Sequence, residues 1–172
     1  MVNDLMNVYG RSSFCDGSVL VDSDYSKGKV LVGTSNLESP DCIIGTKKNN
    51  VILGLDGPDI LYGKKGNDTL KGGFGNDKIF GNSGDDKIIG SEGDDQLYGN
   101  KGNDFVYGGF DSDFLSGGHG NDKLYGDYGD DVLEGGKGVD FFDCGEDYDV
   151  ILDYSSSEGD SQVNCEEINK KD

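Results

Sequence analysis

The stretch Gly72-Gly-Phe-Gly-Asn-Asp-Lys-Ile-Phe80 returns almost unchanged as Gly117-Gly-His-Gly-Asn-Asp-Lys-Leu-Tyr125. The two copies lie 45 residues apart, and a nine-residue period runs without insertion from Gly45 to Leu152. This segment holds twelve copies within a chain of 172 residues. A short fixed period of this kind is typical of proteins in which each repeat packs only against its neighbours.

Glycine and aspartate occupy fixed positions of the repeat. The first position is Gly in eleven copies and Cys144 in the twelfth. The fourth is Gly in nine copies, and Lys48, Asp111 and Asp147 are the exceptions. We expect these glycines to adopt left-handed backbone conformations, which a β-carbon disfavours. The sixth position is Asn50 in the first copy and Asp in the other eleven, which are Asp59, Asp68, Asp77, Asp86, Asp95, Asp104, Asp113, Asp122, Asp131, Asp140 and Asp149.

The eighth position is apolar in every copy, from Ile52 to Ile151. Residues seven to nine are expected to form a very short strand, in which alternation turns only the eighth side chain inward. One buried residue per strand cannot form a core alone, so the copies must stack these residues into continuous ladders. The pattern predicts an all-β solenoid with 18 residues per coil and about six coils. Because Ile43 lies nine residues before Ile52, we expect the ladder to begin one strand early.

Composition excludes several classes of protein. The chain has 30 Gly, and 34 Asp plus Glu against 15 Lys plus Arg, for a net charge of −19. Gly and Asp favour turns over helix interiors, which excludes a helical bundle. The negative charge excludes nucleic-acid binding by charge attraction. No apolar run approaches the ~18 residues that a membrane-spanning helix needs.

The repeated aspartates point to a metal ion. Carboxylates stacked one coil apart repel each other, so the bare chain should not stay folded. Calcium takes about 6–8 oxygen ligands from carboxylates and backbone carbonyls. The glycine-rich turns expose carbonyls and every ninth residue brings a carboxylate, so the spacing predicts calcium sites on which the fold depends.

The pattern Gly-Gly-x-Gly-x-Asp-x-apolar-x resembles the RTX, or hemolysin-type, calcium-binding nonapeptide repeat. The resemblance covers residues 45–152 and implies a parallel β-roll, a right-handed β-solenoid with calcium between the turns of repeats i and i+2. It implies up to about ten ions, held by the eleven aspartates and by carbonyls of the turn residues. The implied glycines are Gly63, Gly66, Gly72, Gly75, Gly81, Gly84, Gly90, Gly93, Gly99, Gly102, Gly117, Gly120, Gly126 and Gly129.

The two ends carry the four cysteines. We expect residues 1–41 to form an N-terminal cap, 42–152 the roll and 153–172 a C-terminal capping segment, because a solenoid leaves unpaired strand edges at its ends. Four cysteines allow three pairings. We favour one clamp per end, Cys15 with Cys42 and Cys144 with Cys165, over free thiols. Zinc is disfavoured because the sequence has no Cys-x-x-Cys and a single histidine.

Catalytic motifs are absent from the sequence. It contains neither Gly-x-Ser-x-Gly nor His-Glu-x-x-His, and its single histidine, His119, occupies a variable turn position. We therefore expect no enzymatic activity. Outward aromatic residues recur one coil apart, as in Tyr62, Phe80 and Tyr98. We favour cross-coil stacking for them over a face that binds sugar rings or a partner protein.

The amino terminus does not resemble a secretory signal, so the chain is either a mature sequence or an intracellular protein; the cysteines favour the first. The expected protein is a secreted or cell-surface calcium-binding β-roll that folds on binding calcium and has a structural or adhesive role. The alternative is a non-catalytic accessory module of a secreted enzyme, which binds polysaccharide or assists folding. Besides calcium, the expected partner of the protein is an extracellular polysaccharide or a cell-surface protein. Lys78, Lys87 and Lys123 lie outward, where they either contact an acidic polysaccharide or offset the acidic turns.

Overall fold

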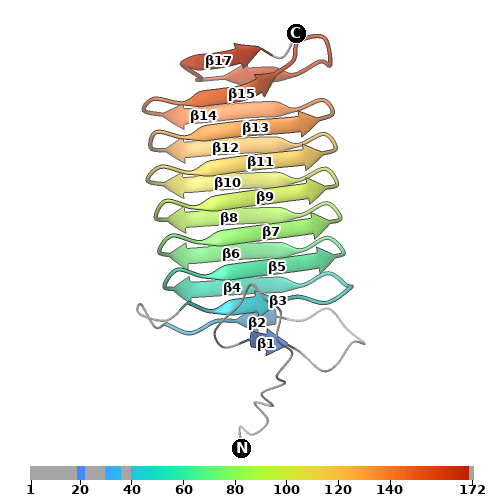
Figure 1. The fold of residues 1–172 in the computed structure, drawn as a ribbon, viewed down its shortest axis with the longest axis vertical. Helices are drawn as coiled ribbons and strands as arrows, with labels where there is room; N and C mark the ends of the chain where they lie inside the picture. The colour runs from blue at the N-terminus through green and yellow to red at the C-terminus, as the bar shows by residue number, and fades with distance from the viewer. Residues whose placement is uncertain (1–18, 22–29, 36–39, 171–172) are drawn as a thin grey trace, which may run out of the picture.

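The chain forms a parallel β-solenoid (Figure 1). A computed structural model describes residues 19–21, 30–35 and 40–170, and these residues contain strands and turns but no helix. No segment within the described residues is a helix long and apolar enough to cross a membrane. The strands alternate between a nine-stranded and an eight-stranded parallel sheet. The expected all-β solenoid is confirmed.

The odd-numbered strands form the nine-stranded sheet. They are β1 (Val19–Val21), β3 (Cys42–Ile44), β5 (Ile60–Lys65), β7 (Lys78–Ser83), β9 (Gln96–Lys101), β11 (Phe114–His119), β13 (Val132–Lys137), β15 (Val150–Tyr154) and β17 (Glu167–Lys170). The even-numbered strands form the other sheet: β2 (Val30–Val32), β4 (Val51–Asp56), β6 (Thr69–Phe74), β8 (Lys87–Glu92), β10 (Phe105–Phe110), β12 (Lys123–Tyr128), β14 (Phe141–Glu146) and β16 (Ser161–Val163). Pairs such as Ile79 with Leu97 confirm the 18-residue coil.

Two features of the strands differ from the expectation. Within the repeats the strands are six residues long and not three, because the chain stays extended through the first three positions of the next copy. The solenoid also has about eight coils and not six, because strands outside the repeats pair with it. Val30–Val32 pairs with Val51–Leu53, and Ser161–Val163 pairs with Phe141–Asp143. These segments lack the Gly and Asp pattern, so only their apolar or β-branched residues signalled them.

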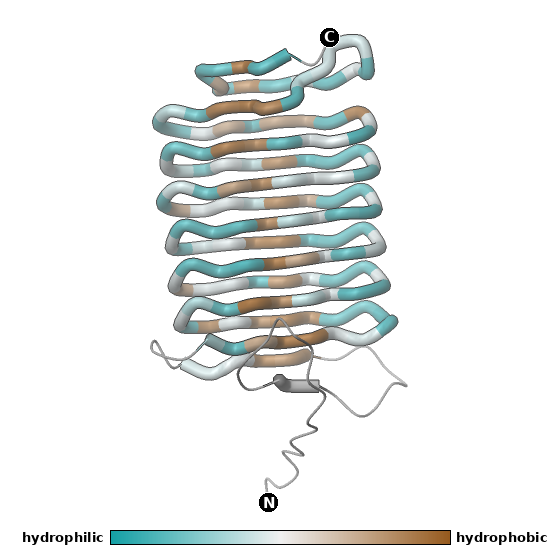
Figure 2. The backbone as a smooth tube through the Cα atoms, in the orientation of Figure 1, coloured by the Kyte–Doolittle hydropathy of each residue, from teal (hydrophilic) through white to brown (hydrophobic). Residues whose placement is uncertain are grey.

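The core is a double ladder of apolar side chains between the two sheets. Every eighth-position residue is fully buried, from Ile52 and Leu61 to Ile151, which confirms that this position faces inward. Figure 2 shows them as brown bands in the middle of the coils, with polar turns on both sides. Ile43 is also fully buried and pairs with Leu61, so the ladder does begin before the first full repeat.

The glycines of the repeat have two different roles. At the fourth position φ is positive, as expected, and Asp111 (φ 74°) and Asp147 (φ 84°) replace glycine there. At the first position φ is not positive, so the expected left-handed conformation is wrong for that position. The second position, which the sequence left unassigned, is left-handed in most copies, as in Asn82 (φ 76°). Two left-handed residues per turn reverse the chain within a few residues.

The outward aromatic residues stack from coil to coil. The ring centroids of Tyr62 and Phe80 lie 4.9 Å apart, and those of Phe80 and Tyr98 lie 5.0 Å apart, with nearly parallel planes. The Lys78 ammonium lies 5.6 Å from the centroid of the Phe80 ring, within reach of a cation–π contact. This geometry matches the expected cross-coil stacking, which stabilises neighbouring strands.

Acidic side chains close the C-terminal end. Asp153 accepts the backbone N–H groups of Gly135 and Gly136, each at 2.8 Å. Asp160 accepts the N–H of Asp140 at 2.9 Å. These carboxylates take the place of a further coil, because they pair backbone donors that would otherwise end unpaired.

The expected disulfide between Cys144 and Cys165 is present. It joins the last full repeat to the C-terminal segment, and Cys144 is fully buried. No cysteine among the described residues is a free thiol, but Cys15, the expected partner of Cys42, lies outside them, so that pairing stays a prediction.

Removing this disulfide should destabilise the roll without unfolding it. For the double variant Cys144→Ala/Cys165→Ala in saturating calcium, we expect the free energy of unfolding to fall by about 3 kcal/mol, because the bond closes a loop of about twenty residues. Urea denaturation followed by circular dichroism measures this change. An unchanged midpoint would show that the carboxylate caps hold the end by themselves.

Candidate metal centre

The sixth-position aspartates form two columns inside the solenoid, where the coils turn. All eleven are 0–3 % exposed. The sixth-position residues of successive repeats lie alternately in one column and in the other. The first column contains Asp41, Asp59, Asp77, Asp95, Asp113, Asp131 and Asp149, and the second contains Asn50, Asp68, Asp86, Asp104, Asp122 and Asp140. Asp41 was missed by sequence reasoning, although its distance of 18 residues from Asp59 was a usable signal.

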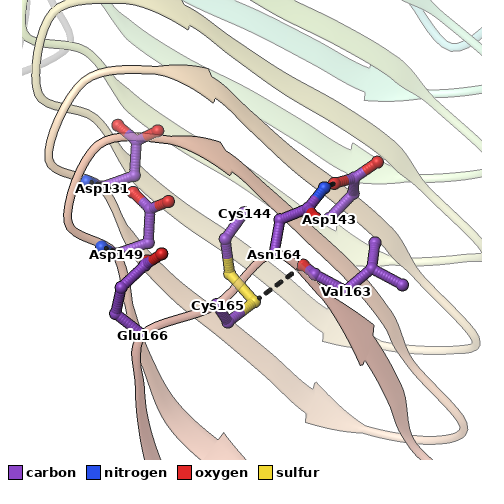
Figure 3. The surroundings of a disulfide bond; sticks show 8 residues. All are labelled: Asp131, Asp143, Cys144, Asp149, Val163, Asn164, Cys165 and Glu166. Carbon is purple, nitrogen blue, oxygen red and sulfur yellow. Dashed lines mark hydrogen bonds between the residues drawn. A yellow bond between two sulfur atoms is a disulfide. The ribbon is translucent and has the colours of Figure 1, made fainter.

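One oxygen of each carboxylate is held by the neighbouring coil. Asp95 Oδ1 accepts the backbone N–H of Asp77 at 2.7 Å, and the same bond recurs along both columns. The first column ends at Glu166, whose Oε2 accepts the N–H of Asp149 at 3.1 Å. Figure 3 shows Asp131, Asp149 and Glu166 along successive coils beside the disulfide. These bonds aim every carboxylate in the same direction.

The other oxygen has no hydrogen-bond partner. This holds for the buried Oδ2 atoms of Asp59, Asp68, Asp77, Asp86, Asp95, Asp104, Asp113, Asp122, Asp131 and Asp149. Buried polar atoms in proteins are nearly always paired, and a buried charge without a partner costs several kcal/mol. Each of these ten oxygens therefore requires a proton or a cation beside it.

The first-position glycines form a cradle for these oxygens. A β-carbon placed on Gly54 would lie 2.5 Å from Asp59 Oδ2 and 2.6 Å from the carbonyl oxygen of Gly72 on the next coil. Steric crowding, and not backbone conformation, therefore explains the glycine in eleven copies. The two oxygens that converge here, a carboxylate and a backbone carbonyl, belong to the ligand types that calcium prefers.

The predicted glycine ligands occupy two separate places. First-position glycines such as Gly63 and Gly72 lie beside the Asp columns. Fourth-position glycines lie in the outer turns, where a β-carbon on Gly75 would come within 2.7 Å of the Gly57 carbonyl oxygen. Within the described residues, no three Asp, Glu, His or Cys side chains gather at one point. A cation in either column would thus need backbone carbonyls as well as carboxylates.

Burial raises the pKa of all eleven aspartates. The pKa rises to about 8 for Asp95 and Asp113, and to about 6 for Asp59, Asp140 and Asp149. The remaining six rise to about 7: Asp68, Asp77, Asp86, Asp104, Asp122 and Asp131. Desolvation is the main cause, and neighbouring carboxylates add to it in most cases. The hydrogen bonds that the carboxylates accept from backbone N–H groups lower the pKa, but this effect is smaller than that of burial.

A second polar row lies on the solvent side of the turns. Asp85 Oδ1 accepts the N–H of Asn103 at 2.8 Å, and Asn103 Oδ1 accepts the N–H of Asn121 at 2.8 Å. These residues occupy the fifth position, which is Asn or Asp in eight copies. In this row each backbone N–H donates to a side chain of the preceding coil, whereas in the buried columns each N–H donates to a side chain of the following coil. It explains the adjacent Asp pairs, in which one carboxylate is exposed and the other buried.

Comparison with known proteins identifies the repeats. The family model of the RTX calcium-binding nonapeptide repeat (4 copies) matches residues 44–79, 53–88, 80–115, 107–142 and 116–151. These overlapping matches run from residue 44 to residue 151, more than half of the chain. No curated protein matches the sequence.

Proposed function

The chain belongs to the family of the RTX calcium-binding nonapeptide repeat, and we propose on that basis that it is an extracellular β-roll module whose folding is coupled to calcium. The observation that carries the proposal is the set of ten buried Oδ2 atoms without a partner. In the unfolded chain these carboxylates are solvated, whereas in the roll they are buried one coil apart. Bound calcium would supply the positive charge that makes the buried, ionised columns stable.

The residues proposed to hold calcium are the column aspartates and the carbonyls of the first-position glycines. Seven successive aspartates in the first column leave six intervals between coils. Five in the second, from Asp68 to Asp140, leave four. Ten divalent ions in these intervals would offset a net charge of −19 almost completely. The Asn50 interval is left out because an amide carries no charge.

A structural or adhesive role is supported by the shape. About eight coils at ~4.8 Å each make a stiff column about 38 Å long. The disulfide at its end is typical of oxidising compartments and supports an extracellular location. The stacked aromatic residues with Lys78 beside them favour one second candidate, an accessory module that binds polysaccharide. A glycan array probed in calcium separates the two roles, because only the accessory module would bind a defined sugar.

A calcium titration tests the coupling of folding to metal. We expect the far-UV circular dichroism of the metal-free chain at neutral pH to change cooperatively from disordered to β when calcium is added. Modules of this extracellular kind bind in the range of about 10⁻⁴–10⁻³ M. Magnesium is the control, because it resists a carbonyl-rich shell and should not fold the chain. A β spectrum that is already complete in metal-free buffer would refute coupled folding.

The neighbouring pair Asp94 and Asp95 offers a matched test of the site. Asp95→Asn keeps an Oδ1 acceptor for the Asp77 N–H but removes the buried charge. Because Asp95 borders two intervals, we expect isothermal calorimetry to find about two ions fewer per chain. Asp94→Asn changes an exposed carboxylate in the same turn and should leave the count unchanged. Equal losses in the two variants would contradict the interior site.

A further inference from the structure

The two sides of the roll differ in charge. The turns that follow the odd strands lie along one side of the column and those that follow the even strands along the other (Figure 1). On the first side, the third repeat position carries cations or neutral polar residues. We call this row the basic edge: Lys65, Ser83, Lys101, His119 and Lys137. Residues in neighbouring coils are paired in register, as in Lys101 with His119.

The other side carries acids and aromatic rings at the same repeat position. This row is the acidic edge: Asp56, Phe74, Glu92, Phe110, Tyr128 and Glu146. The fourth and fifth positions of these turns add Asp94, Asp111, Asp130 and Asp147, and no lysine or arginine. Phe110 and Tyr128 are 53 % and 48 % exposed and stack at 5.2 Å. The acidic edge therefore presents apolar rings between carboxylates.

Both edges have the same pitch. Lys65, Lys101 and Lys137 recur every 36 residues, which is every second coil. Asp94 and Asp130 recur at the same interval, and so do Asp111 and Asp147. At ~4.8 Å per coil this distance is about 9.6 Å on either edge. Two straight rows of opposite charge with equal spacing can pair at several coils at once.

The charges on these edges are not neutralised within the described chain. No ion pair engages Lys65, Lys101 or Lys137, and the side-chain carboxylates of Glu92 and Glu146 accept no hydrogen bond from the described residues. The column aspartates are inside the roll and would be balanced by calcium. The surface charge of the edges would then decide how two rolls meet.

We propose that the acidic edge of one copy docks against the basic edge of a second copy, with the two columns side by side. The inference rests on the calcium-bound roll proposed above. In this contact lysines meet carboxylates, and Lys101 or His119 can lie over the exposed Phe110 and Tyr128 rings. A pair of copies leaves the basic edge of one and the acidic edge of the other free, so the contact is heterologous and extends into rows. A narrow edge buries little surface, so a single contact is weak and gains from tethering many copies together.

A charge-swap experiment tests the pairing. Lys65→Glu/Lys101→Glu/Lys137→Glu makes both edges acidic, and Glu92→Lys/Glu146→Lys weakens the acidic edge by placing lysines there. In calcium, sedimentation analysis should show concentration-dependent association of the wild type. We expect each variant alone to associate about tenfold or more weakly, because attractive charges become repulsive. Mixing the two variants should restore association. Raising the salt from about 0.05 M to about 0.5 M should weaken it.

The matched control is Lys71→Glu/Lys87→Glu/Lys123→Glu, which makes the same change in net charge on the face of the eight-stranded sheet. It should associate like the wild type. Circular dichroism of every sample separates the two proposals: a chain that is folded in calcium but monomeric at all concentrations overturns edge pairing and leaves coupled folding intact. A wild type that stays monomeric but binds polygalacturonate through the basic edge would also overturn it, in favour of an acidic polymer as the occupant.

Discussion

Lowering the pH from about 8 to about 5 is expected to fold the chain in metal-free solution, without any calcium. The folded columns bind protons more tightly than the unfolded chain, because the pKa of the buried aspartates lies at about 6 to about 8 against 3.8 for an exposed aspartate. A proton on Oδ2 removes the buried charge in the same place where calcium would balance it. Acid should therefore replace the metal.

The direction of this effect follows from linkage. Because these pKa values are raised in the folded state, the stabilising contribution is complete below pH 3.8 and is lost as the pH rises through about 6 to about 8. One pKa unit corresponds to about 1.4 kcal/mol, and domains are stable by only about 5–15 kcal/mol. The free-energy cost of ionising about ten buried carboxylates without a cation is therefore larger than the free energy of unfolding of an ordinary domain.

Far-UV circular dichroism from pH 8 to pH 5 in buffer stripped of metals measures this transition. We expect a cooperative change from disordered to β with a midpoint between about pH 6 and about pH 7. A sample saturated with calcium is the control and should be β throughout this range. A metal-free chain that is disordered at pH 5 would show that charge on the columns is not what keeps it unfolded.

Gly90→Ala is expected to cost about 3–5 kcal/mol of unfolding free energy, which makes it the most damaging single substitution that we predict. A β-carbon at Gly90 would lie 2.7 Å from the carbonyl oxygen of Gly108 and still closer to Asp95 Oδ2. Neither neighbour can retreat, because the carbonyl belongs to a paired strand and Asp95 is held by the Asp77 N–H. The clash also fills the proposed calcium cradle.

Urea denaturation in saturating calcium measures the loss, and a calcium titration should show a weaker midpoint. Ser91→Ala is the neighbouring control. Ser91 already carries a β-carbon at a φ of 107°. Ser91→Ala removes only a hydroxyl group and should change the free energy of unfolding by less than about 0.5 kcal/mol. If Gly90→Ala costs no more than Ser91→Ala, the first-position glycine is not there to make room for the carboxylate.

The nine-residue period of the sequence predicted much of the fold. A nine-residue pattern with one apolar residue per copy leaves stacking as the only way to bury Ile79 or Leu97. The 18-residue coil was predicted from the same period, whereas the Cys144–Cys165 disulfide was predicted from the position of both cysteines near one end of the chain. Strand length was not predictable, because a glycine such as Gly81 favours no particular conformation. The extended path through it depends on pairing of its neighbours with the next coil, as in Phe80 with Tyr98 and Asn82 with Asn100.

The metal centre was only partly predictable. Asp at every sixth position indicated a carboxylate column, but not that it lies inside the solenoid. Nor did the sequence show that one oxygen is bonded across 18 residues while the other faces a glycine of the opposite sheet. The capping roles of Asp160 and Glu166 were also missed, because both lie outside the repeat register.

The sequence by itself determined what is local or repeated: the coil length, the inward ladder from Ile52 to Ile151, and the presence of a carboxylate and a glycine in eleven of the twelve copies. These follow from the chemistry of nine residues copied in order. Tertiary structure alone decided which of these groups meet. The cradle beside Gly54, the ten unpaired oxygens and the two edges of opposite charge each depend on contacts between coils, and such contacts exist only once the chain has wound upon itself.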